Sequence, residues 1–287
     1  MTIRNPIEWG YDQVRLAVIA VGTAGDALGD RTDAARAAPL AVRRIDFSDL
    51  KDALVRGFDD FKAYRTDVVF LCLIYPVIGL VLARHAFGDG MLTMLFPFAS
   101  GFALIGPFAA IGLYEMSRRR EQNVHVAWPD AFSVVRAPAF GKIAVLGTLL
   151  VAMFFLWLAA ANVIYTFTMG PEQPASLIAF INDLFRTSAG WALIALGVGV
   201  GFLFAVLVLA TSVVSFPLLL DRDVSLVTAV WTSTRAAIAN PVPIAIWGLI
   251  VAAGLLLGTI PAFLGLVVVV PVLGHATWHL YRKVVAS

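Results

Sequence analysis

Two histidines near the C-terminal end, His275 and His279, have a spacing that would allow both side chains to bind one ligand. They lie four residues apart in an apolar run, so on a helix both imidazoles project from one face. Two imidazoles at this spacing can bind a metal ion or the iron of a haem. Glu115 and Asp221 end two other apolar runs, at a comparable depth. These four side chains are the candidate metal ligands of the sequence.

A structural role for the same histidines is the stronger expectation. His279 lies beside Trp278, Tyr281 and Arg282, and such a group is typical of the aromatic and basic belt that anchors a helix at a membrane interface. His275 would then hydrogen-bond a neighbouring helix. We therefore expect no cofactor, with metal or haem binding as the alternative.

A basic run follows Glu115, and it too has two interpretations. Arg118 and Arg119 stand three and four residues after Glu115, which is the spacing of a favourable ion pair on one helix. The basic run can also mark the cytoplasmic side or bind anionic lipid headgroups. The side chains expected to contact lipid or the interface are Arg118, Arg119, Arg120, Trp128, Trp231 and Trp278.

The amino-acid composition indicates which class of protein contains these candidate residues. Of the 287 residues, 60% are hydrophobic and only 14% are charged, against roughly 45–50% and about 25% in soluble domains. This excludes an ordinary soluble enzyme, a disordered chain and a nucleic-acid binder. Cys72 is the only cysteine, so an intrachain disulfide is impossible. No phosphate-binding glycine loop, zinc spacing or nucleophile elbow occurs, and we expect no enzymatic activity.

The apolar residues fall into six runs that are close to the ~20 residues a helix needs to cross a bilayer. The fold class is therefore all-α, a polytopic bundle of six transmembrane helices. The expected spans are 67–86, 92–116, 141–168, 190–220, 242–258 and 261–281. Residues 46–287 form this membrane domain, and residues 1–45 are a polar, partly mobile cytoplasmic tail.

Basic residues predict the orientation of these spans. Nineteen of the 21 Lys and Arg residues lie before the first span or after an even-numbered one, and only Arg84 and Arg186 lie on the other side. Because basic residues accumulate in cytoplasmic loops, both termini are expected in the cytoplasm. The predicted location is a bacterial inner membrane.

Three amphipathic segments on the cytoplasmic side each precede a pair of spans, which suggests three repeated units. The segments begin near Asp46, Trp128 and Asp223, and helices of this kind lie in the interface plane. In the first, an apolar stripe holds Leu50, Leu54, Gly57, Phe58, Phe61 and Tyr64, and Asp52, Arg56, Asp59, Asp60 and Lys62 lie opposite. A further amphipathic helix, 177–185, is expected on the outer surface.

Several of these motifs resemble a bacterial family, the domain of unknown function 2189, over residues 42–285. The similar stretches are 42–45, 57–61, 73–79, 112–115, 215–223 and 271–282. The resemblance implies an integral membrane protein and no established activity. Some members carry a cytochrome c oxidase label, but a haem–copper centre needs more histidines deep in the bilayer than the four in this sequence.

Three functions remain open at this stage. The first is an accessory, scaffolding or assembly protein that binds membrane lipids or a membrane complex, for example a respiratory one, or forms a homodimer. The second is a permease for a small or lipid-like solute, which would use helices interrupted by proline. The third is a redox protein that uses His275 and His279. No nucleic-acid partner is expected.

Overall fold

The elements of regular secondary structure in the described part of the chain are helices. The structure, a computed structural model, describes residues 40–88, 92–124 and 126–286, so most of the predicted tail lies outside the described residues. The long helices are α4 (Phe47–Ala63), α5 (Arg65–Cys72), α6 (Ile74–Gly88), α7 (Leu95–Ala109), α8 (Ile111–Glu121), α9 (Phe140–Met169), α10 (Leu177–Arg186), α11 (Ser188–Ser212), α12 (Ser215–Asp221), α13 (Leu226–Ala239), α14 (Pro241–Thr259) and α15 (Leu266–Val284). Two 3₁₀ segments, η1 (Leu92–Met94) and η2 (Trp128–Arg136), complete them.

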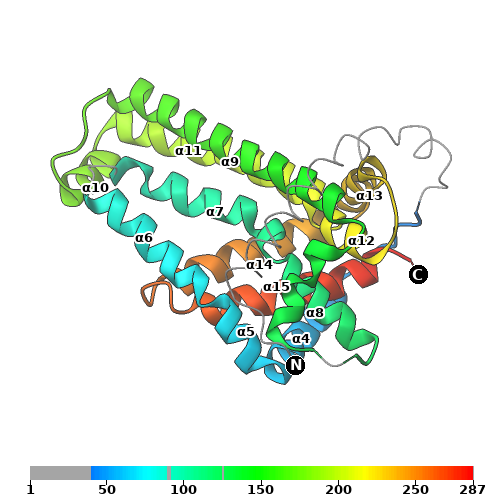
Figure 1. Ribbon diagram of the computed structural model, residues 1–287. Coiled ribbons are helices and arrows are strands. Elements are labelled where there is room, and N and C mark those ends of the chain that lie inside the picture. Colours follow the sequence, from blue (N-terminus) through cyan, green and yellow to red (C-terminus); the bar gives the residue numbers. More distant parts are fainter. Residues whose placement is uncertain (1–39, 89–91, 125, 287) are drawn as a thin grey trace.

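The helices form an elongated body with two different ends (Figure 1). Helix α9 packs between α7 and α11 along its length, and α10 folds back onto α11 at one end. At the other end α4 packs along α15, and α8 packs against α15 from a second direction. The three helices of this second end come from distant parts of the sequence, and they carry the residues described below.

Four helical segments of the described chain are long and apolar enough to cross a membrane. They are Phe96–Glu121, Phe140–Met169, Ser188–Asp221 and Pro241–Thr259. A fifth arises if helix α4 and the segment Arg65–Val81, which meet at a bend of 93°, count as one broken span. Helix α15 is not among these segments because polar residues fill its C-terminal half. The all-α membrane fold is confirmed, whereas the prediction of six spans is not.

The amphipathic segments form as expected only in part. Helix α4 begins with a capping box, in which Asp46 accepts the N–H of Ser48 and Asp49 reaches back to the N–H of Asp46. Helices α10 and α13 are both present, but the cap of α13 is Ser225, two residues beyond the Asp223 at which we expected the helix to start. The second segment is the 3₁₀ helix η2. The three repeated units remain a prediction.

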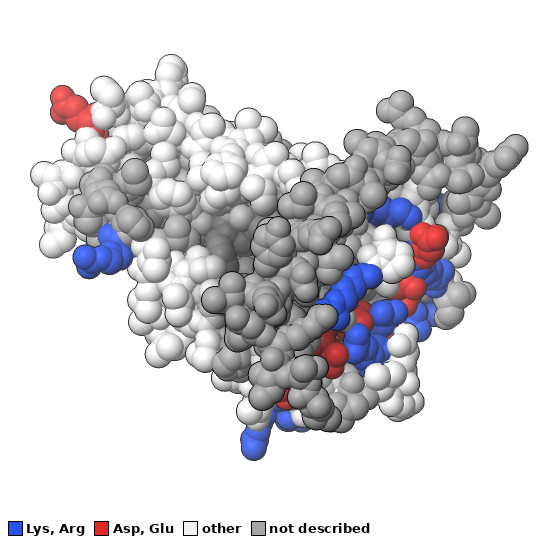
Figure 2. Space-filling model, in the orientation of Figure 1, with Lys and Arg blue, Asp and Glu red and all other residues white. Residues whose placement is uncertain are grey.

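Charged side chains gather at one end of the molecule. Figure 2 shows blue and red atoms concentrated where α4, α8 and α15 meet, and the opposite end, near α10, carries few of them. The long helices between the two ends expose large apolar side chains, among them Phe155, Phe202 and Leu249. An apolar middle and a charged end are what a bilayer and its aqueous face require.

At the charged end, the first and last residues of the described chain are joined by backbone hydrogen bonds. The N–H of Arg43 donates to the carbonyl of Val284 (2.8 Å), and the N–H of Ala286 donates to the carbonyl of Ala41 (3.1 Å). The buried Asn240 side chain accepts from the N–H of Ile45 (2.8 Å). The last residues of the predicted tail are therefore fixed against the C-terminal helix.

Candidate functional site

The candidate functional site is a network of polar side chains from α4, α8 and α15. It forms because α4 and α15 approach each other closely. The buried residues of α4 are Leu50, Ala53, Gly57 and Asp60, which recur at helical spacing and form one face. At Gly57 a β-carbon would lie 2.5 Å from the backbone nitrogen of Ala276. Only the absence of a side chain lets the two backbones come so near, and this brings Asp60 level with the histidines of α15.

Asp60 is the hub of the site, and the prediction that it lies on the polar face of its helix is wrong. It is only 4% exposed, because it stands three residues after Gly57 and points at α15. One carboxylate oxygen accepts from the Ser117 hydroxyl (2.6 Å) and from His279 Nε2 (2.9 Å), and the other accepts from Arg120. A buried carboxylate is stable only with such partners. Asp60 thus joins α4, α8 and α15.

The network continues inward from Ser117. Its hydroxyl lies 2.8 Å from Nδ1 of His275, and both residues are fully buried. If Ser117 donates its single proton to Asp60, Nδ1 of His275 carries a proton and donates to the serine oxygen. Nε2 of His275 has no hydrogen-bond partner within the described residues. The chain of hydrogen bonds therefore ends at His275.

Towards the surface the network becomes looser. Nδ1 of His279 lies 3.8 Å from Glu121, and Arg282 reaches the same carboxylate at 3.3 Å. These distances exceed the 2.7–2.9 Å typical of strong charged hydrogen bonds. The Glu121 carboxylate therefore keeps the capacity to bind another donor.

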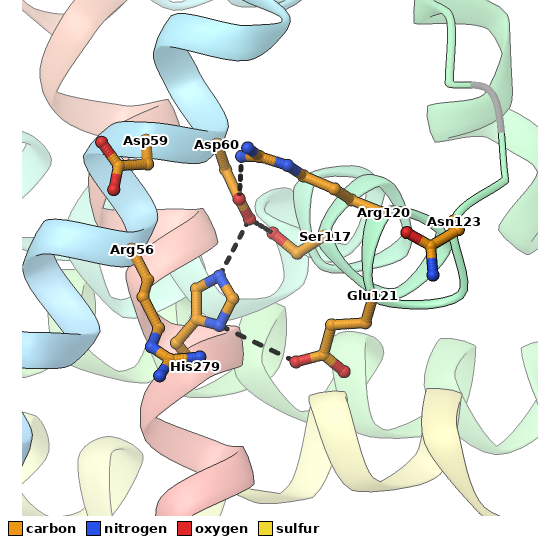
Figure 3. Close-up of a pocket in the computed structure, with 8 residues that line it drawn as sticks. All are labelled: Arg56, Asp59, Asp60, Ser117, Arg120, Glu121, Asn123 and His279. Atoms are coloured by element: carbon orange, nitrogen blue, oxygen red, sulfur yellow. Dashed lines mark hydrogen bonds and ion pairs between the residues drawn. The ribbon is translucent and has the colours of Figure 1, made fainter.

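A pocket of about 370 Å³ opens beside this network (Figure 3). Its walls come from α4, from α8 and the turn that follows it, and from α15. The lining residues are Arg56, Asp59, Asp60, Ser117, Arg120, Glu121, Asn123 and His279. A second pocket of about 220 Å³ shares Arg56, Glu121 and His279.

Serine, histidine and aspartate occur together here, but their order of bonding is not that of a nucleophilic triad. In a triad the histidine lies between the serine and the carboxylate. Here Ser117 and His279 both bind the same oxygen of Asp60, and Ser117 is fully buried. The arrangement is suited to joining three helices and to presenting polar groups to the pocket.

The structure separates the four candidate ligands that we predicted. His275 and His279 contact Ser117 and Asp60, whereas Glu115 is held by Arg118 and Arg119, each at 2.8 Å. Within the described residues, no group of three or more His, Cys, Asp and Glu side chains is placed to hold a metal ion.

Asp221, the fourth candidate, belongs to a separate contact. Its carboxylate accepts from the Tyr281 hydroxyl at 2.6 Å and from Arg282 at 3.2 Å. The Arg282 guanidinium also reaches Glu121 (3.3 Å), so this contact is connected to the rim of the site through one side chain. Metal or haem binding stays a prediction.

The three tryptophans expected at the lipid interface divide into two groups. Trp128 and Trp231 are 40% and 60% exposed, so both can reach a membrane interface. Trp278 is completely buried and packs on Tyr281 (ring centroids 5.5 Å apart), so lipid cannot contact its ring in this structure. It lies on the face of α15 that packs against the rest of the protein, which the local sequence did not reveal.

Charge pairs hold the outer part of α4 and the end of α15 in place. Lys283 contacts Asp52 at 2.9 Å and Asp49 at 3.1 Å. The hydrogen bond to Asp52 raises the pKa of the Lys283 ammonium above its ordinary value. At the start of α4, the Ser48 hydroxyl lowers the pKa of the capping carboxyl of Asp46. Both groups are therefore charged at neutral pH.

Comparison with known proteins supports the membrane assignment. The model of a family described as "Predicted integral membrane protein (DUF2189)" matches residues 95–221, which confirms the family resemblance over that part of the chain. Neither a curated protein nor a solved structure matches the chain. The match covers α7 to α12 and includes Ser117, Arg120 and Glu121 of the site. The family match and the apolar helices identify an integral membrane protein.

Proposed function

We propose that this integral membrane protein is an accessory or scaffolding protein without enzymatic activity, which binds lipids and a membrane complex. The observation that carries the proposal is the surface of the segment Ser188–Asp221. This segment has 34 residues, and its most apolar 18-residue window has a mean hydropathy of 2.8, yet only 6% of that window is buried within the protein. Much of this window is thus available to other membrane components.

The shape of this surface favours a protein partner. Phe202 and Leu203 project from it, each about two-thirds exposed, at 65% and 66%. Within the two preceding turns of α11, β-carbons built at Gly197 and Gly199 would meet no atom within 4 Å. Small residues let another helix approach closely, and projecting side chains supply van der Waals contact. The proposed partner is a transmembrane helix of another protein or of a second copy.

A photo-crosslinking side chain at Phe202 should capture that partner in native membranes. We expect one discrete adduct that survives purification, because a packed helix holds its neighbour at a fixed position. Leu249 on α14 is the matched control, since it is 68% exposed and also apolar, and it should give lipid adducts only. Lipid adducts alone at both positions would contradict the proposal.

We also propose that the charged end faces the cytoplasm of a bacterial inner membrane, with six spans and both termini inside. The support is the charge distribution. Arg186 lies at the α10 end, whereas Arg56, Arg118 and Arg282 lie at the end formed by α4, α8 and α15. In this proposal α14 and α15 form a closing hairpin, which turns at residues 260–265.

Thiol labelling of whole cells tests this orientation. Cys72 is buried, and replacing it with alanine gives a cysteine-free background. A membrane-impermeant maleimide should label Glu172→Cys, near α10, in intact spheroplasts, and should label Lys51→Cys only after the membrane is opened. Both positions are exposed in the structure. The opposite pattern would place the charged end outside and overturn the proposed orientation.

A further inference from the structure

The pocket between α4, α8 and α15 has a mixed lining that narrows the class of ligand it can bind. Two guanidinium groups, Arg56 and Arg120, reach it from different helices, and Asp59 and Glu121 supply carboxylates. A simple anion would meet these carboxylates, and a simple cation would meet the guanidinium groups. A ligand that carries one negative and one positive group can pair with both the guanidinium groups and the carboxylates of the lining.

The basic side chains keep donors for a phosphate group. Arg56 uses its Nε for Asp52 (2.9 Å), and Arg120 uses one Nη for Asp60 while its guanidinium lies over the Tyr64 ring (5.8 Å). Each guanidinium has five N–H donors, so these contacts leave several directed towards neither partner. Arginine is well suited to phosphate because its planar fork matches the oxygen geometry.

The acidic wall can receive an ammonium group. Glu121 is held only at 3.3 Å by Arg282 and at 3.8 Å by His279. Its side chain is 32% exposed, whereas that of Asp60 is 6% exposed and already has three partners. Glu121 therefore keeps more capacity to accept a hydrogen bond than Asp60, and its two partners lie farther away than the Lys62 ammonium, which holds the Asp59 carboxylate at 2.7 Å. Asn123, which follows α8, adds an exposed amide at the same rim.

The position of the pocket in the molecule favours a lipid headgroup as the ligand. The pocket belongs to the charged end, where α4, α8 and α15 meet. On α4, exposed Val55 and Phe58 directly precede Arg56 and Asp59 in the sequence. The volume of about 370 Å³ is at the lower end of the ~300–1,000 Å³ of small-molecule sites, which suits a headgroup.

We propose that this pocket binds a zwitterionic phosphate–ammonium headgroup, as in phosphatidylethanolamine. Arg56 and Arg120 bind the phosphate, and Glu121 accepts hydrogen bonds from the ammonium group. The inference makes the lipid-binding part of the proposed function specific and rests on it, but it does not require the protein partner on α11. Free phosphoethanolamine has the same chemistry and is the other source to be tested.

Lipid headgroups that differ in one feature each provide the experiment. The purified full chain is delipidated in detergent and offered phosphatidylethanolamine, phosphatidylcholine or phosphatidylglycerol, and retained lipid is counted by native mass spectrometry. Choline has no N–H donor, and glycerol has no ammonium group. We expect phosphatidylethanolamine to be retained about tenfold better than either, equivalent to about 1.4 kcal/mol. A parallel arm titrates free phosphoethanolamine, and binding there without lipid retention makes the soluble compound the ligand.

Three variants assign the residues. Arg56→Gln should lose most of the retained phosphatidylethanolamine, and Glu121→Gln should lose the preference for it over phosphatidylcholine. Lys51→Gln, an exposed position on the same helix outside the pocket, should behave as the wild type. Equal retention of all three lipids with no binding of phosphoethanolamine, or an unchanged Arg56→Gln, would overturn the proposal. Crosslinking from Phe202 should persist in every variant, so the two proposals fail separately.

Discussion

Replacing Asp60 with alanine should destabilise the protein more than any other single change at the charged end. The substitution leaves Ser117, His279 and Arg120 without their common acceptor, and two of these are buried. Removal of one partner from a buried charged pair costs about 3–5 kcal/mol. Because Arg120 is 37% exposed and can be rehydrated, we expect a loss near the lower limit, about 3 kcal/mol. Denaturation in mixed micelles measures it.

The neighbouring Asp59 provides the control. Its side chain is 49% exposed and, among the described residues, forms an ion pair with Lys62 on the same helix, so Asp59→Ala should change the free energy of unfolding by less than about 1 kcal/mol. The Asp60→Asn variant distinguishes charge from hydrogen bonding, since the amide keeps one acceptor oxygen. Equal stability of the Asp59→Ala and Asp60→Ala variants would show that the network contributes nothing.

Replacing Gly57 with alanine should separate α4 from α15. The added methyl group would lie 2.5 Å from the backbone nitrogen and 2.6 Å from the β-carbon of Ala276. Neither is the end of a flexible side chain, so one helix must move. Added carbon in a packed contact costs typically about 1–3 kcal/mol, only partly offset by the better helix propensity of alanine, worth about 1 kcal/mol. The same denaturation assay measures the net loss.

A second consequence of the Gly57 change concerns the pocket. As α4 moves away, Asp60 leaves His279, and retention of phosphatidylethanolamine should fall as it does in Arg56→Gln. Gly106→Ala on α7 is the control, because a β-carbon there meets no atom within 4 Å. Its stability should be unchanged or slightly increased. A Gly57→Ala protein as stable as the wild type would mean that the helix contact is looser than described.

The residues of the site show why local patterns predicted some of it and missed the rest. Glu115 pairs with Arg118 and Arg119 as expected, because the partners are three and four residues apart on one helix. Asp60 was placed on the wrong face because its polarity was given more weight than its position. Its spacing from Ala53 and Gly57 could have placed it on the buried face.

Composition and short-range patterns were enough to predict the membrane class, the all-α fold, a start of α4 near Asp46 and the concentration of basic residues on one side. Each depends on composition or on residues within one or two helical turns. The contacts of His279 with Asp60, 219 residues away, and of Ser117 with His275, 158 residues away, were not predictable from local sequence. Such partners are selected by which helices pack together. The packing depends on contacts such as that of Gly57 with Ala276. Nothing in the sequence near either residue indicates that the two are in contact.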